Sequence, residues 1–143
     1  MSILNIKNLN TYYGKSHILQ GVNLNLDKPG CLALLGRNGA GKSTTLRSIV
    51  NLTKPSSGEI IFKDTKLKGL STYQIAEKGL TMVPENRGMF SSLTVIESLN
   101  IINNNNNKWN IERVLESFPQ LKSKLQNNSI SLSGGEQQML AIS

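Results

Sequence analysis

The order of apolar and polar residues predicts strands early in the chain and helices later. Residues 22–27, VNLNLD, alternate with a period of two, which is typical of a strand buried on one face. LNIKNL, near the amino terminus, shows the same pattern more weakly. Residues 31–36, CLALLG, are apolar at every position, as in a parallel strand covered on both faces. GEIIFKD (58–64) and GLTMVP (79–84) are predicted as further strands.

Helical patterns follow these apolar segments. Residues 71–79, STYQIAEKG, predict a short helix with Ser71 as its N-cap and Gly79 as its end. Another helix is predicted directly after GKST, where three apolar residues fall on one face: Leu46, Ile49 and Val50.

From about residue 92 the chain is expected to be helical. Thr94 and Glu97 have the spacing of a capping box, in which two backbone donors of a helix start are satisfied reciprocally, and they open VIESLNII. Ser133 and Glu136 repeat that spacing, so a further helix is expected to begin at Ser133. The asparagine run 103–107 is predicted to be a solvated loop. A stripe with helical spacing is assigned to the core: Trp109, Ile111, Val114, Leu115 and Phe118.

Composition restricts the class of protein. A chain of 143 residues, 38% hydrophobic and 17% charged, fits one soluble globular domain. No apolar run approaches the ~20 residues of a membrane-spanning helix, so we expect a cytosolic protein. The single cysteine, Cys31, lies in an apolar run and is expected to be a buried structural thiol. His17 is expected to be a surface residue.

The net charge of +7 raises the question of nucleic-acid binding. The basic residues are scattered rather than gathered in a stripe, and the chain has only one Trp, three Tyr and three Phe. Stacking platforms for single strands need more aromatic side chains in one place. We therefore assign the charge to a solvated face and expect no nucleic-acid partner.

Residues 36–44, GRNGAGKST, carry the strongest chemical signal. They match G-x-x-x-x-G-K-[ST] at Gly36, Gly41, Lys42 and Ser43, with an apolar run before and a helical pattern after. Glycines let successive backbone N–H groups turn toward one anion, and the positive end of the following helix adds to that attraction. The lysine can reach the β- and γ-phosphates, and the serine hydroxyl can ligate Mg²⁺. The sequence therefore predicts a nucleotide site.

A second glycine motif lies at residues 132–137, LSGGEQ. It places Gly134 and Gly135 in the first turn of the helix capped by Ser133, where unsatisfied N–H groups can meet an anion. Alone this motif is weak, but together with a phosphate-binding loop upstream it is highly specific.

With both motifs, the chain resembles the nucleotide-binding subunits of ABC transporters from its first residues to its last. The resemblance implies an α/β fold: a P-loop NTPase (ABC ATPase) core with an antiparallel β subdomain and a helical signature subdomain, its C-terminal part missing. Residues 1–30 would then form the mostly antiparallel β part. Residues 31–85 would form the P-loop α/β core, and residues 86–143 the helical subdomain with the signature motif.

The resemblance also implies ATP and Mg²⁺ as ligands and assigns residue roles. Tyr13, just before Gly14, occupies the family's position for an aromatic ring against the adenine, a contact worth ~1–3 kcal/mol. In the family, the signature of one subunit closes over the ATP of the other, which assigns that role to Ser133, Gly134 and Gly135. Phosphate contacts fall to the loop and the helix start: Gly36, Asn38, Gly39, Ala40, Gly41, Lys42, Ser43, Thr44 and Thr45.

More specifically, the chain resembles the ATP-binding subunits of branched-chain amino acid importers in the segments TMVPENRGMFSSLTVIESL, SFPQLKSKL and SLSGGEQQMLAIS. The wider family has glutamine after V-P, near Mg²⁺ and the attacking water, whereas this chain has Glu85. A glutamate can ligate a hard cation, but its charge opposes the γ-phosphate. Ser43 and Glu85 are thus the candidate Mg²⁺ ligands, and the candidate catalytic residues are Lys42, Glu85, Ser133 and Gly135.

The resemblance implies an ATPase that drives an amino-acid importer. ATP would close a head-to-tail dimer of two ATP-binding subunits, hydrolysis would reopen it, and membrane-spanning permease subunits would convert the motion into transport. The subunit would be cytoplasmic and peripheral on the inner face of the cell membrane.

The family's Mg²⁺-binding aspartate, its catalytic glutamate and its switch histidine all follow the signature and are not in this sequence. We therefore expect little hydrolysis by this chain alone, marginal stability and aggregation, with partly uncovered apolar residues: Leu32, Leu34, Met82 and Val83. One alternative is a truncated, non-hydrolysing remnant that binds nucleotide or membrane subunits. Another is a soluble ABC ATPase of DNA repair or translation.

Overall fold

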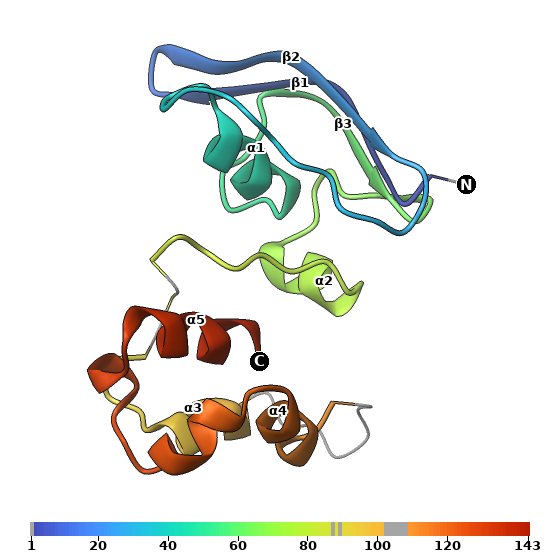
Figure 1. Cartoon of the computed structure of the whole chain (residues 1–143). Coiled ribbons are helices and arrows are strands. Elements are labelled where there is room, and N and C mark those ends of the chain that lie inside the picture. The colour runs from blue at the N-terminus through green and yellow to red at the C-terminus, as the bar shows by residue number, and fades with distance from the viewer. Residues whose placement is uncertain (1, 87, 89, 102–108) are drawn as a thin grey trace. The chain divides into compact units, whose positions relative to one another are not determined.

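The computed structural model describes residues 2–86, 88, 90–101 and 109–143 (Figure 1). The chain divides into two compact units, Met1–Met82 and Val83–Ser143, each with its own hydrophobic core. The asparagine run at 103–107 lies outside the described residues, so the predicted loop there stays a prediction.

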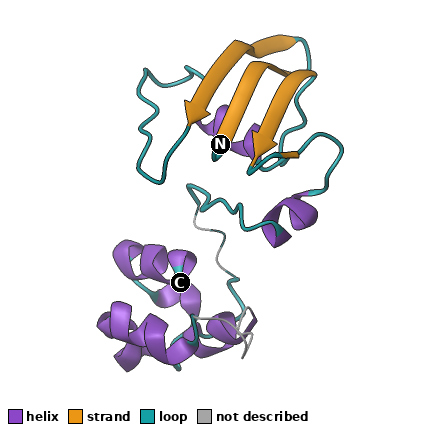
Figure 2. Cartoon of the chain, turned by 90° about the vertical axis from the view of Figure 1, so that its right-hand side faces the viewer, coloured by secondary structure: helices purple, strands orange, loops and turns teal. Residues whose placement is uncertain are grey.

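The first unit is built on a four-stranded antiparallel sheet with the order β2-β1-β3-β4 (Figure 2). The predicted strands at 22–27, 58–64 and LNIKNL are confirmed within it. β1 pairs with β2 from Leu4 opposite Leu26 to Tyr13 opposite Ser16. The strands are β1 (Leu4–Tyr13), β2 (Ser16–Leu26), β3 (Ser57–Phe62) and β4 (Thr65–Lys66).

Helix α1 (Lys42–Ile49) lies against one face of this sheet, and α2 (Thr72–Glu77) follows β4 (Figure 1). Ile49 of α1 and Ile75 of α2 are buried, whereas Leu46 is 46% exposed, so only part of the predicted apolar face of α1 is buried. Burying a side chain of this size stabilises the fold by about 1.5–3 kcal/mol. The core of the unit comprises Ile6, Leu9, Leu19, Ile49, Ile60, Phe62, Leu67 and Ile75.

The predicted parallel strands at 31–36 and 79–84 are wrong for this structure, which has irregular backbone in both segments. A strand exists only when a neighbouring strand accepts and donates its hydrogen bonds. Among the described residues, the paired strands are those of the antiparallel sheet, and neither segment joins them.

The side chains of these two segments are accordingly exposed. Cys31 is exposed rather than a buried structural thiol, because its segment joins no sheet in the described part of the chain. Leu35 is 91% exposed. The expectation of uncovered apolar surface is confirmed at Leu32 and Val83, which are 48% and 42% exposed, and Leu34 and Met82 are half-buried.

The second unit is helical. Its core consists of Val95, Leu99, Val114, Leu121, Leu132 and Leu140. The helices are α3 (Val95–Ile101), α4 (Ile111–Ser117) and α5 (Gly134–Ile142), with the 3₁₀ helices η1 (Pro119–Lys124) and η2 (Ser129–Ser131).

The predicted helix starts are confirmed at atomic detail. The Thr94 N–H donates to Glu97 Oε2 at 2.8 Å, and the Glu97 N–H donates to Thr94 Oγ1 at 3.3 Å. Ser71 forms a capping box with Gln74, and Gly79 follows α2 with φ +85°.

Trp109 is 58% exposed, so its assignment to the core is wrong. Asn110 is the N-cap of α4, and its side chain accepts from the Arg113 N–H at 2.9 Å. Trp109 therefore precedes the helix and does not share its buried face, whereas Val114 is buried. The Arg113 guanidinium lies 5.0 Å from the centre of the Trp109 ring. None of the described helices is long and apolar enough to cross a membrane.

Candidate nucleotide-binding site

The loop Gly36–Gly41 turns sharply into α1. Gly39 and Gly41 have φ +84° and +89°, a backbone region that glycine enters without steric cost. The Ala40 N–H donates to the Arg37 carbonyl at 3.1 Å and closes a turn. A Cβ on Gly41 would lie 2.7 Å from Leu19 Cδ2, so a side chain here would have to displace that of Leu19.

Lys42 is held across the loop that precedes it. Its ammonium donates to the carbonyl oxygens of Gly36 at 2.8 Å and Arg37 at 2.9 Å. These bonds use two of the three donors of the ammonium. The loop therefore positions a positive charge over its own backbone, where a phosphate would approach.

The start of α1 is open to an anion. Its N-cap is Gly41, in the left-handed region, and among the described residues no side chain caps it by a hydrogen bond. The first turn carries no acidic residue that would repel an anion. By contrast, side chains cap α2, α4 and α5. The partial positive charge of a helix start, left without a cap, is a natural anion site.

The residues after Lys42 differ in exposure. Ser43 is half-buried in the first turn of α1, while Thr44 and Thr45 are 8% and 5% exposed. The Thr45 hydroxyl donates to the Gly41 carbonyl at 2.9 Å, which strengthens the first turn. The loop residues Asn38, Gly39 and Ala40 are all exposed. Their contacts with phosphate stay predictions.

The structure brings Tyr13, at the end of β1, close to the helix that follows the loop. Its hydroxyl lies 3.2 Å from Thr53 Oγ1. The hydrogen bond with Thr53 is the main cause that lowers the pKa of Tyr13, with smaller effects from Thr44 and the charge of Arg47. The ring is 47% exposed, so it has free area for a planar ligand. Sequence reasoning missed Thr53, because a contact across 40 residues leaves no local motif.

The signature residues belong to the second unit. The Ser133 N–H donates to Glu136 Oε2 at 2.8 Å, and the Glu136 N–H donates to Ser133 Oγ at 3.3 Å. These bonds lower the pKa of Glu136, with the backbone bond of Ser133 as the first cause. The side-chain hydrogen bond of the Ser133 hydroxyl to the Glu136 carboxylate is the second cause of this shift, so both the N–H and the hydroxyl of Ser133 engage Glu136. A Cβ on Gly135 would meet no atom within 4 Å, so this turn is open.

The two candidate Mg²⁺ ligands lie in different units, Ser43 in the first and Glu85 in the second. Their joint use of one ion stays a prediction. Among the described residues, no three His, Cys, Asp or Glu side chains gather into a metal site. His17 is half-buried in β2, with Nε2 3.0 Å from Asn10 Oδ1 and its ring stacked 4.1 Å from that of Tyr12.

Comparisons with known proteins agree with this arrangement. A family model described as "ABC transporter" matches residues 19–143. The chain is 38% identical, over 98% of its length, to the high-affinity branched-chain amino acid transport ATP-binding protein BraG of Pseudomonas aeruginosa. It is 34% identical, over 94% of its length, to the "Probable branched-chain amino acid transport ATP-binding protein LivF" of Archaeoglobus fulgidus.

Solved structures show the same likeness. An ATP-binding subunit of an ABC transporter superposes with a TM-score of 0.82 at 26% identity, over 98% of this chain and 60% of that one. The dimeric structure of MJ0796, a bacterial ABC transporter cassette, gives a TM-score of 0.79 at 27% identity, over 97% of this chain and 67% of that one. This chain covers 62% of BraG and 58% of LivF.

Proposed function

This chain belongs to the ABC transporter family and matches the N-terminal part of its ATP-binding relatives. We therefore propose that the intact protein is the ATP-hydrolysing subunit of a branched-chain amino acid importer. One observation carries the nucleotide part: a glycine loop places the Lys42 ammonium beside the uncapped start of α1. The names of the relatives BraG and LivF support the amino-acid substrate. The subunit is cytoplasmic and peripheral on the inner face of the membrane.

The residues of the first unit fit ATP. Open N–H groups at a helix start, glycines that leave room for a backbone approach and a nearby ammonium are the donor set that polyphosphates require. Lys42 exchanges its carbonyl partners for the β- and γ-phosphates. The half-exposed ring of Tyr13 stacks on the adenine. ATP supplies the phosphoanhydride bond that is broken, and these residues bind and orient the ATP molecule.

Ser43 and Glu85 hold Mg²⁺ through oxygen atoms, the ligands that this hard cation prefers. The Ser133 hydroxyl and the N–H groups of Gly134 and Gly135 contact the γ-phosphate bound by a second ATP-binding subunit. Closure of this head-to-tail dimer moves the permease subunits. In this assignment, residues 1–30 are the antiparallel β part, residues 31–85 the P-loop core and residues 86–143 the helical subdomain.

The test begins with the protein purified from the cells that make it. Its intact mass is compared with the 15.7 kDa of this chain, and its ATP hydrolysis and the uptake of labelled leucine by the cells are measured. We expect a larger mass, hydrolysis, and loss of both activities in Lys42→Ala. Nucleotide binding without hydrolysis at a mass of 15.7 kDa would instead support the non-hydrolysing remnant. If the unmodified protein hydrolyses ATP but cells with the Lys42→Ala variant take up leucine at an unchanged rate, the transport assignment is wrong.

A further inference from the structure

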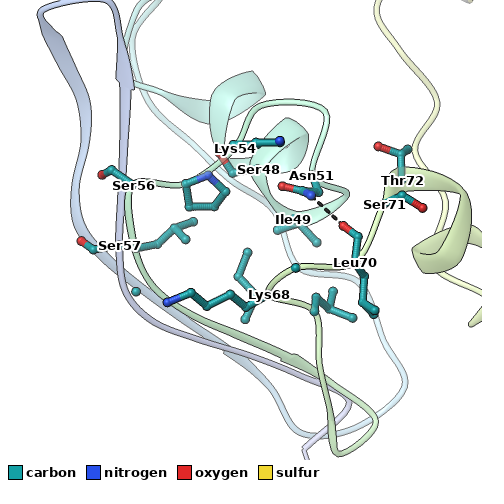
Figure 3. A pocket seen from close by; sticks show the side chains of 16 residues that line it. Ser48, Ile49, Asn51, Lys54, Ser56, Ser57, Lys68, Leu70, Ser71 and Thr72 are labelled. Atoms are coloured by element: carbon teal, nitrogen blue, oxygen red, sulfur yellow. Dashed lines mark hydrogen bonds between the residues drawn. The ribbon is translucent and has the colours of Figure 1, made fainter.

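A cavity lies in the first unit at the end of α1 that is opposite the nucleotide loop (Figure 3). Its volume is about 520 Å³. Small-molecule sites commonly have ~300–1,000 Å³ and combine an apolar lining with a few polar groups. The nucleotide loop contributes no residue to this cavity, so it is separate from the site described above.

The lining is apolar in its deep part and polar at its edges. Among the apolar residues, Leu9, Ile60 and Leu67 are 0%, 6% and 3% exposed and belong to the core of the unit. In Figure 3, Ser56 and Ser57 lie on one side of the cavity, and Ser71 and Thr72 lie on the other. An occupant would therefore place an apolar body against the core and a polar group at the edge.

The charged groups of the lining are all positive. They are Lys54 and Lys68, and none of the lining residues is an aspartate or glutamate. The charge of Lys68 acts on Glu59, a carboxylate that Lys66 already engages at 2.5 Å. The hydrogen bond from Lys66 is the first cause that lowers the pKa of Glu59, and the charge of Lys68 contributes last.

The negative end of α1 offsets little of this positive charge. Its last carbonyls are already bonded: the Arg47 oxygen accepts from the N–H groups of Leu52 and Thr53, and the Ser48 oxygen accepts from that of Asn51. These carbonyls already have backbone partners, so the preference for an anion rests on the two lysines of the lining.

The walls of the cavity are held in place. Asn51 adopts φ +58°, and its Nδ2 donates to the Leu70 carbonyl at 2.7 Å, which joins the end of α1 to the segment before α2 (Figure 3). On the opposite wall, a Cβ on Gly58 would lie 2.5 Å from the Asn8 carbonyl oxygen, so the backbones of β1 and β3 are in direct contact there. A site that is formed in advance loses less conformational entropy on binding.

We propose that this cavity binds a small aliphatic monocarboxylate, with its hydrocarbon body against Leu9, Ile60 and Leu67 and its carboxylate at the edge, attracted by the positive charges of Lys54 and Lys68. A zwitterionic amino acid fits less well, because its ammonium would meet two lysines and no acidic group. The volume suits a small molecule rather than a segment of a partner protein.

The test is a titration of the whole chain with octanoate, followed by ¹H–¹⁵N NMR. Octylammonium, with the same body and the opposite charge, and acetate, with the charge but no body, are the matched ligand controls. We expect octanoate alone to give saturable shifts, centred on the residues that line the cavity. Equal shifts with octylammonium, shifts confined to the nucleotide loop, or binding of an acidic peptide in place of octanoate would overturn the proposal.

A pair of variants separates charge pairing from general electrostatics. The double variant Lys54→Gln/Lys68→Gln should weaken octanoate binding about two- to thirtyfold, because each exposed ion pair contributes modestly and two are removed. Lys28→Gln/Lys78→Gln makes the same change in net charge outside the lining and should leave the affinity unchanged. All four lysines are exposed, so both variants are expected to fold. Equal affinity for octanoate in the two double variants would rule out a contribution of Lys54 and Lys68 to binding.

Discussion

The helices α1 and α5 both begin at a glycine-rich motif, but they begin in opposite ways. At α1 the N-cap is a left-handed glycine, Gly41, with no capping side chain among the described residues. At α5 the N-cap Ser133 is extended and bonded reciprocally to Glu136. The start of α5 is stabilised by its own side chains, whereas the start of α1 keeps its attraction for an anion.

This difference suits the two helix starts to different roles. The start of α1 is the place where nucleotide affinity should reside, because its donors gain a partner only when a ligand binds. The start of α5 presents a preformed turn, closed by the reciprocal bonds of Ser133 and Glu136. The tyrosines Tyr12, Tyr13 and Tyr73 lie in the first unit and the single tryptophan, Trp109, in the second, so each unit has its own spectroscopic reporter.

The largest effect is expected for Lys42→Ala, on the affinity for ATP. A hydrogen bond to a charged group contributes about 1.5–3 kcal/mol, so ATP affinity should fall about ten- to hundredfold. A titration with a fluorescent ATP analogue measures it. Lys28→Ala removes a lysine from the exposed segment after β2 and should bind as the unmodified chain does. Equal affinity in the two variants would mean that α1 is not the nucleotide site.

Gly41→Ala should destabilise the first unit. A residue with a Cβ in the left-handed region costs about 1–2 kcal/mol, and here the Cβ would also lie 2.7 Å from Leu19 Cδ2. Urea denaturation followed by tyrosine absorbance measures the loss. Gly39→Ala is the matched control, since Gly39 has a similar φ of +84° but no neighbour within 4 Å of the added Cβ. If the two variants lose equal stability, the contact with Leu19 is without consequence.

Ser133→Ala should destabilise the second unit by about 1 kcal/mol, the usual cost of removing a serine N-cap. Urea denaturation followed by Trp109 fluorescence reports on this unit. Ser133→Gly should cost only a few tenths of a kcal/mol, because glycine is an acceptable N-cap. ATP binding to a single chain should not change in either variant. A loss of ATP affinity would contradict the separation of the two helix starts.

The smallest effect is expected from a change of pH on the stability of the second unit. The pKa values of Glu97 and Glu136 are lowered, in each case first by the backbone N–H of the capping residue. Because the folded-state pKa is the lower one, the stabilisation is complete above about pH 4.3, the ordinary glutamate pKa, and is lost as pH falls through the folded value. The fluorescence-monitored stability of the second unit should therefore decline in acid.

Glu136→Gln separates the capping box from other acidic groups. Glutamine keeps the box but cannot titrate, so part of the acid-induced loss should disappear. Glu116→Gln, an exposed change on α4, should retain the full acid-induced loss. Identical pH profiles for both variants would exclude Glu136 as a source of the pH dependence.

Much of the local structure could be predicted because the signals act over a few residues. A capping box joins positions three apart, and the starts of α2, α3 and α5 all lie where Ser71, Thr94 and Ser133 placed them. The alternation in 22–27 predicted a strand, and its Val22 and Leu24 pack against the core of the first unit. The glycine loop and its lysine were likewise visible, since backbone conformation and charge there depend on residue type alone.

The tertiary structure alone decided which segments acquire partners. Residues 31–36 have the apolar composition of a buried strand but no strand to pair with among the described residues, so Cys31 and Leu35 are exposed. The bond of Tyr13 with Thr53 and that of Asn51 with Leu70 join residues 40 and 19 positions apart. Propensity and capping act within one turn of backbone, whereas burial and strand pairing depend on which distant residues cover a segment.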